Sequence, residues 1–150
     1  THSKLGTVGV QGRAADVIRL YEAARARGVD VTADCYPYDA SSTMIHADPT
    51  MLGGRVLIAS SEPHPECAGR FLHDIATDWQ LPLVDAARRL QPGSAIYFLM
   101  AEEDVQRILA FDETMVGSDG IPLGDHPHRG NEGPLHVRQH ARQRVDGSAP

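Results

Sequence analysis

The sequence predicts an α/β fold with parallel strands, and three observations carry this prediction. Apolar residues recur at helical spacing over residues 13–27. A continuous apolar run over residues 95–100 is typical of a strand that is buried on both faces. Strand-like and helical stretches alternate along the chain, and this order is typical of parallel strands joined by right-handed crossovers.

Composition and charge exclude several classes of protein. Hydrophobic residues make up 41% and charged residues 23% of the 150 residues, which is typical of a soluble globular chain with one modest core. The net charge of −6 argues against nucleic acid as a partner. No apolar run reaches the roughly 18 residues that span a bilayer, so no membrane partner is expected. The first residues, which start at Thr1 and not at a methionine, contain no signal segment of basic and apolar residues, and the expected location is the cytoplasm.

The first predicted helix follows a short strand end and a loop. Residues 1–4 are expected to end a strand, and residues 6–12 form a loop punctuated by glycines. The helix over residues 13–27 ends at Gly28. One face of this helix carries Ala14, Val17, Ile18, Tyr21 and Ala24.

Two strand segments and an irregular stretch follow this helix. Apolar and polar residues alternate over residues 29–33 and lead into a turn at residues 34–38, so a strand is predicted there. Residues 41–49 are polar and are predicted to be irregular, whereas residues 55–59 are a short strand candidate. Cys35 and Cys67 do not form a disulfide framework, and both are expected to be free thiols.

The second half contains a helical zone and two further strands. Residues 69–91 are predicted to be helical, with a new helix starting at Pro82, because proline is tolerated in a first turn. The strand over residues 95–100 is followed by a helix over residues 102–111 and by a strand over residues 114–116.

A tight turn after the last strand carries Asp119. The apolar run breaks at Gly117, and Ser118 and Gly120 leave the aspartate uncrowded at the carboxyl end of the strand. Ligands and catalytic groups gather at that end in α/β sheets and barrels. The alternative interpretation is an ordinary Asx-turn, in which Asp119 caps its own backbone.

Reactive side chains are predicted at the carboxyl ends of three strands. They are His2 with Lys4, the turn over residues 34–38, and Asp119. If these strands are parallel and adjacent, the side chains meet at one edge. Imidazole and carboxylate together suit zinc, and a carboxylate beside a metal can accept a proton from water. A solitary histidine such as His2 is, however, more often structural or solvated.

A second histidine motif, His126-Pro127-His128, resembles a metal chelate in its spacing. A His-x-His pair on a strand places both imidazoles on one face. Here the pair lies in a loop that contains a proline, with no apolar strand before it. The favoured interpretation is therefore a pair of loop histidines and not two metal ligands.

Several segments resemble one enzyme family. Thr1-His2-Ser3-Lys4 is similar to the Ser-His-x-Lys segment of the D-aminoacylases, the N-acyl-D-amino-acid deacylases of the amidohydrolase superfamily. Residues 34–43 resemble the Asp-x-Tyr-Pro-Tyr-x-Ala-x-Ser-Thr loop of that family, and residues 114–122 match its last barrel strand and catalytic aspartate turn. Residues 95–98 and 104–109 also resemble the family, and all matches occur in the family's order.

The resemblance implies a (β/α)8 TIM barrel of which this chain holds roughly the last three βα units. Residues 1–129 are then the C-terminal part of the barrel, and residues 130–150 are a divergent polar tail that frays or forms a short helix. The missing N-terminal half of the barrel is the implied partner.

The resemblance also implies roles for individual residues. His2 is implied to be a zinc ligand, and Asp119 to be both a metal ligand and the general acid/base. The substrate-binding residues implied are Lys4, Tyr36, Ser42 and Arg129. The match of Arg129 is one residue short, because the family pattern Pro-His-Pro-Arg corresponds here to Pro127-His128-Arg129.

The implied function is hydrolysis of small-molecule N-acyl-D-amino acids with zinc as the cofactor. The other metal ligands of the family have no counterpart in residues 1–150, so the chain is expected to be a fragment that is inactive alone. Two alternatives stay open. One is an amidohydrolase of the dihydroorotase or hydantoinase type, against which the Tyr36-Pro37-Tyr38 loop argues, and the other is a non-catalytic remnant.

Overall fold

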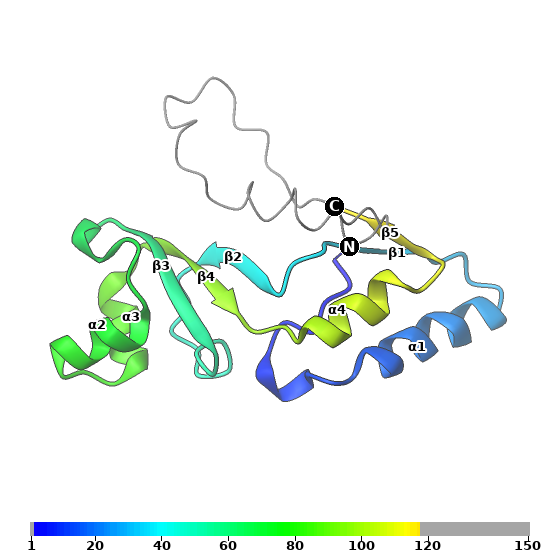
Figure 1. Cartoon of the computed structure of the whole chain (residues 1–150), viewed down its shortest axis with the longest axis horizontal. Helices are drawn as coiled ribbons and strands as arrows, with labels where there is room; N and C mark the ends of the chain where they lie inside the picture. The colour runs from blue at the N-terminus through cyan, green and yellow to red at the C-terminus, as the bar shows by residue number, and fades with distance from the viewer. Residues whose placement is uncertain (1, 118–150) are drawn as a thin grey trace, which may run out of the picture.

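The structure, a computed structural model, describes residues 2–117 of the chain, and these residues form two regions (Figure 1). Residues 2–39 and 99–117 form what is called here the parallel region, and residues 40–98 form the antiparallel region. In chain order the elements are η1 (Val8–Val10), α1 (Ala14–Ala26), β1 (Ala33–Cys35), β2 (Ala40–Met44), β3 (Arg55–Ser61), η2 (Pro65–Cys67), α2 (Leu72–Trp79), α3 (Leu83–Leu90), β4 (Gly93–Phe98), α4 (Glu102–Leu109) and β5 (Thr114–Val116).

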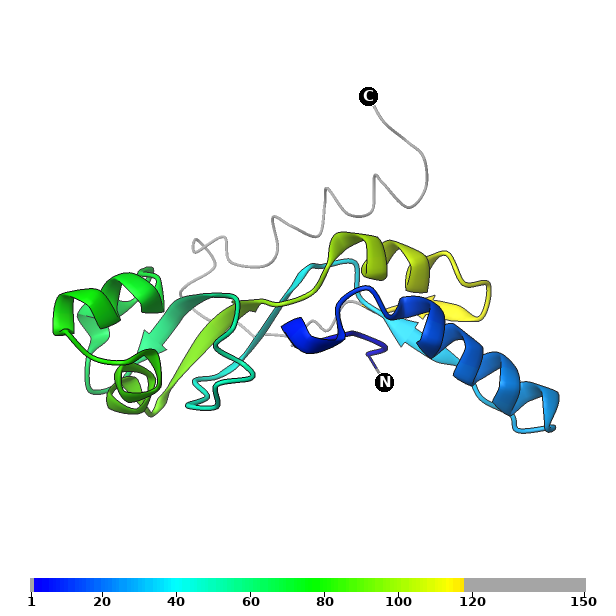
Figure 2. The same ribbon diagram turned by 90° about the horizontal axis from the view of Figure 1, so that it is seen from below.

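Two parallel strands, β1 and β5, form the centre of the parallel region. Ala33 lies opposite Thr114, and Cys35 lies opposite Val116. On the other edge of β1, the backbone N–H of Ser3 donates to the carbonyl of Asp34 at 2.6 Å. Helices α1 and α4 pack against each other beside these strands (Figures 1 and 2). The parallel strands that the alternation predicts are therefore confirmed in this region.

A buried carboxylate fixes the start of α1. Asp104, in the first turn of α4, is 3% exposed. Its Oδ2 accepts the backbone N–H of Gly12 at 2.6 Å, and its Oδ1 accepts the N–H of Ala14 at 3.1 Å. These N–H groups lie at the amino end of α1, where they have no partner within the helix and where negative charge is favourable. Asp104 thus replaces the side-chain cap that Arg13, the N-cap residue, does not provide.

Three antiparallel strands in the order β2-β4-β3 form the sheet of the other region. Ala40 and Arg55 both lie opposite Phe98, so the two outer strands flank β4 at the same end. Helices α2 and α3 pack against each other, and α2 contacts β3. The largest side chains buried in this core are Tyr97, Ile58, Leu72, Ile75, Leu90 and Cys67, and Leu99, the first residue after β4, packs into the same core.

The prediction of parallel strands throughout is wrong for the antiparallel region. A single crossover helix carries the chain back to the start of the sheet, but two consecutive helices, α2 and α3, connect β3 to β4. Antiparallel neighbours need no crossover back to the starting end of the sheet, and both β2 and β3 pair with β4 in this direction. The prediction that residues 41–49 are irregular is also wrong in part, because Ala40–Met44 forms β2.

The described helices are short. Among residues 2–117, no helix has the length and apolar character needed to cross a membrane.

Candidate active site

His2 and Asp34 lie side by side at the edge of β1. The backbone N–H of His2 donates to Asp34 Oδ1 at 2.6 Å, and His2 Nδ1 lies 3.4 Å from Asp34 Oδ2. Both side chains are partly buried, with 31% and 23% of their surface exposed. The structure therefore brings together an imidazole and a carboxylate that are 32 residues apart in the sequence.

A lysine and a tyrosine adjoin this pair. Lys4 Nζ donates to the hydroxyl of Tyr36 at 2.6 Å. The Tyr36 ring is buried and lies edge-on to the His2 ring, with 5.3 Å between the ring centroids. An ammonium group has three donors, and the Tyr36 hydroxyl takes one of them. The exposed end of Lys4 thus places a positive charge beside the His2–Asp34 pair, where it suits an anionic ligand.

Gly117, the residue that follows β5, lies close to the carboxylate of Asp34. Gly117 donates its N–H to the carbonyl of Cys35 at 2.9 Å, which extends the parallel pairing beyond β5. A β-carbon added at Gly117 would lie 3.4 Å from Asp34 Oδ2. The chain thus passes Asp34 two residues before the predicted catalytic Asp119.

Several of the predicted site residues lie outside the described residues. They are Asp119, Arg129 and the histidine pair His126 and His128. Their predicted roles stay predictions.

Ser42, predicted to bind substrate, lies in the antiparallel region. It is exposed on β2, opposite Ile96 of β4. Within residues 2–117 its hydroxyl forms no hydrogen bond. The described structure thus groups Lys4 and Tyr36 with His2 but gives Ser42 no contact with them.

Cys35 lies next to Asp34 but has the character of a core residue. Burial, together with the negative charge of Asp34, raises the pKa of the Cys35 thiol to about 11, while Lys4 opposes the shift. A thiol with this pKa is protonated near neutral pH and is a poor metal ligand or nucleophile. Cys35 and Cys67 are both free, as the sequence predicts, and the structure shows that both are buried.

The donors at the site fit part of a zinc site. Zinc takes imidazole and carboxylate ligands, and it needs four ligands, or three and a water. Residues 2–117 hold no group of three or more histidine, cysteine, aspartate or glutamate side chains placed to bind one metal ion. The His2 imidazole and its carboxylate neighbour therefore supply one side of such a site, and further ligands are needed from elsewhere.

Asp34 is the member of this group for which sequence reasoning gave no role. Its position at the end of a predicted strand placed it at the edge of the sheet where His2 is also expected. The contact with His2 depends on the adjacent segment of residues 2–4, whose pairing with β1 has no local signal in the sequence.

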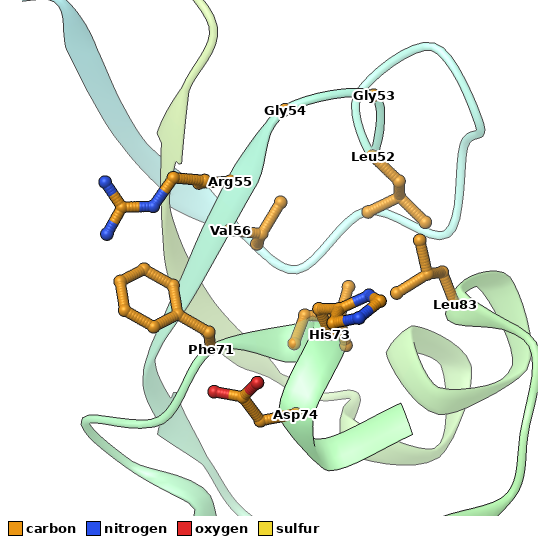
Figure 3. A pocket seen from close by; sticks show the side chains of 10 residues that line it. Leu52, Gly53, Gly54, Arg55, Val56, Phe71, His73, Asp74 and Leu83 are labelled. Carbon is orange, nitrogen blue, oxygen red and sulfur yellow. The ribbon is translucent and has the colours of Figure 1, made fainter. Parts of the chain in front are cut away.

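A hollow of about 510 Å³ lies elsewhere, in the antiparallel region (Figure 3). It lies between the start of β3, the start of α2 and Leu83 of α3. The guanidinium of Arg55 lies at its rim, over two aromatic rings. Its Cζ is 4.5 Å from the ring centroid of Phe71 and 5.3 Å from that of Phe98. None of the predicted site residues lines this hollow.

Comparison with known proteins gives clear relatives. No family model matches the chain. The D-aminoacylase of Alcaligenes xylosoxydans xylosoxydans is 49% identical over 117 residues, which are 78% of this chain and 24% of that enzyme. A crystal structure of D-aminoacylase, described as defining a novel subset of amidohydrolases, superposes with a TM-score of 0.75 and 48% identity, covering 81% of this chain and 25% of that one.

A second neighbouring structure was determined with zinc bound. The N-acyl-D-glutamate deacylase of Bordetella bronchiseptica, complexed with zinc and a phosphonate inhibitor, has a TM-score of 0.72 and 42% identity, covering 81% of this chain and 26% of that chain. The fold and the neighbouring structures are thus of the amidohydrolase class. Within that class the chain belongs to the D-aminoacylase family, as the sequence motifs indicate. It spans about a quarter of the length of the curated relatives that it matches.

Proposed function

We propose that the chain is the C-terminal part of the catalytic barrel of a zinc-dependent N-acyl-D-amino-acid deacylase. The parallel region supplies roughly the last three barrel strands, namely the segment of residues 2–4, β1 and β5. The antiparallel region is then an insertion between the last two of them.

The observation that carries the proposal is the cluster at the edge of β1. The imidazole of His2, a side chain of the kind that binds metal ions, lies in ring contact with Tyr36, and Tyr36 accepts a hydrogen bond from Lys4. A substrate with an amide to be cleaved and a carboxylate close by needs a metal donor and a cation at short separation. N-acyl amino acids have both groups.

Each residue has a distinct task in this proposal. His2 holds the metal, and bound zinc supplies Lewis acidity to the amide carbonyl. Lys4 binds the substrate carboxylate, and the Tyr36 hydroxyl holds the ammonium of Lys4 in place. Arg129 is proposed as a second cation for the same carboxylate.

Asp119 is proposed to move the proton. Hydrolysis forms a bond between a water oxygen and the amide carbonyl carbon and breaks the carbon–nitrogen bond. Asp119 accepts the proton that the water loses and delivers it to the leaving nitrogen, so the products are a carboxylate and a free D-amino acid.

The test is a chimera in which residues 1–129 replace the matching segment of the Alcaligenes D-aminoacylase. With zinc present, we expect the chimera to release amino acid from N-acetyl-D-amino acids and not from the L enantiomers. The 150-residue chain alone is expected to be inactive. A folded chimera that binds zinc but hydrolyses neither enantiomer would favour the non-catalytic remnant.

A further inference from the structure

The carboxylate of Asp34 contacts both the backbone and the ring of His2. Oδ1 accepts the His2 backbone N–H at 2.6 Å, and Oδ2 lies 3.4 Å from the ring nitrogen Nδ1. The carbonyl of Asp34 accepts the next backbone N–H, from Ser3, at 2.6 Å. Asp34 thus holds the backbone on both sides of the His2 α-carbon, and its second carboxylate oxygen faces the ring at ion-pair distance.

The backbone of His2 adopts a conformation that needs such support. Its φ is 60°, in the left-handed region that few residues other than glycine adopt. A strained backbone persists where surrounding contacts hold it in place, and such positions cluster at functional sites. The two hydrogen bonds from residues 2 and 3 to Asp34 hold it on both sides of the strained residue.

The distance of 3.4 Å between Nδ1 and Oδ2 is longer than a normal hydrogen bond, but the negative charge this close to the ring still bears on which ring nitrogen carries the proton. A neutral histidine carries its proton on either Nδ1 or Nε2. A lone pair on Nδ1 facing a carboxylate oxygen is repulsive, whereas an N–H there is attractive. The carboxylate therefore favours the proton on Nδ1, and the lone pair is left on Nε2.

We propose that Asp34 is a positioning residue that holds His2 in the Nδ1–H tautomer, with Nε2 presented as the metal donor. The consequence for zinc affinity rests on the proposed function, but the tautomer itself does not. Carboxylates that accept the second ring N–H of a metal-bound histidine orient the ring and raise its basicity, and their loss costs about 10–100-fold in metal affinity.

The first experiment measures the tautomer without metal. Nitrogen-15 NMR of the full 150-residue chain at pH 8, with labelled histidine, distinguishes the two ring nitrogens of His2. We expect Nδ1–H in the wild type. Asp34→Asn keeps an oxygen for the backbone N–H but turns an amide donor toward Nδ1, so the Nε2–H form is expected. Asp30→Asn, an exposed change four residues earlier in the chain, is the matched control.

An Nε2–H tautomer in the folded wild-type chain overturns the proposal, as does a tautomer that Asp34→Asn leaves unchanged. The second experiment measures zinc affinity in the chimera by competition with a chelator. Asp34→Asn is expected to weaken zinc binding about 10–100-fold, whereas Asp30→Asn leaves it unchanged. Equal affinity in both variants overturns the positioning role. A chimera that is inactive with any sequence at residue 34, while the tautomer shift is observed, contradicts the proposed function alone.

Discussion

The two regions of the molecule differ in where they place their buried residues and their reactive ones. The antiparallel region has the large hydrophobic core, in which Ile58, Ile75, Leu90 and Tyr97 are fully buried. The parallel region has two small clusters, one around Cys35 and one around Tyr36. It also exposes more than half of the surface of Met115 and Val116 on β5.

The residues of the candidate site lie in the region with the smaller core. His2, Lys4, Asp34 and Tyr36 all lie in the parallel region. The region with the weaker core therefore carries the candidate site, and the region with the stronger core carries little of it. Changes at the site residues of the parallel region should alter chemistry, and changes in the core of the antiparallel region should cost the most stability. Four predictions test this division.

The largest effect is expected at Asp119. In the chimera, Asp119→Asn should lower kcat by about 10²–10⁴-fold, because the amide keeps the shape of the side chain but cannot accept the proton from water. Steady-state hydrolysis of an N-acetyl-D-amino acid measures the change. Asp112→Asn, an exposed change before β5, is the control and should leave kcat unaltered. A kcat within a few-fold of wild type for Asp119→Asn would remove the proposed role.

The next effect concerns stability in the antiparallel region. Ile75 is 0% exposed, and Ile75→Ala should lower the free energy of unfolding by about 2–5 kcal/mol through lost burial and a cavity. Denaturant unfolding of the chimera measures it. Leu20→Ala, at a residue that is 71% exposed, should change the stability by less than about 0.5 kcal/mol. If Ile75→Ala leaves stability intact but abolishes turnover per folded molecule, the division between the regions is wrong.

A smaller loss of stability is expected in the parallel region. Asp104→Asn leaves one oxygen to accept two backbone N–H groups, so one buried donor of α1 loses its partner. The expected cost is about 1–3 kcal/mol. Urea unfolding compares this variant with Glu103→Gln, an exposed change one residue earlier. Equal midpoints for the two variants would show that the cap contributes nothing.

The smallest effect is expected at Lys4. In the chimera, Lys4→Met should raise KM for N-acyl-D-amino acids on the order of tenfold, with less change in kcat, because the cation attracts the carboxylate in ground and transition states alike. Arg27→Met, which removes another exposed cation, should leave KM unchanged. An unchanged KM with a collapsed kcat would instead place Lys4 in the metal site or on the proton path.

Much of the local structure could be predicted from the sequence. The helix predicted over residues 13–27 is α1, Ala14–Ala26, and the strand predicted over residues 114–116 is β5. Proline at position 82 is the N-cap of α3, one position from its predicted place as the first helical residue. These elements depend on apolar periodicity and on glycine or proline at their ends, which are local signals.

Strand direction and strand β2 could not be predicted in this way. An apolar run such as residues 95–100 suits the centre of a parallel or an antiparallel sheet equally well. The residues of β2 are small and mostly polar, and their partner in the sheet, β4, begins 49 residues after β2 ends. For the site, the sequence indicated that His2 and Asp34 lie at one edge, but their distance depends on tertiary pairing.

The ends of the antiparallel region have a consequence for how such proteins diversify. Ala40, where the chain enters the region, lies opposite Phe98, where it leaves. Paired strands are only about 4.7–4.9 Å apart, so a short hairpin turn is enough to bridge the same two points. The geometry at these two ends therefore allows the 40–98 segment to change in length and sequence without a change in the register of β1 against β5, beside which the candidate site lies.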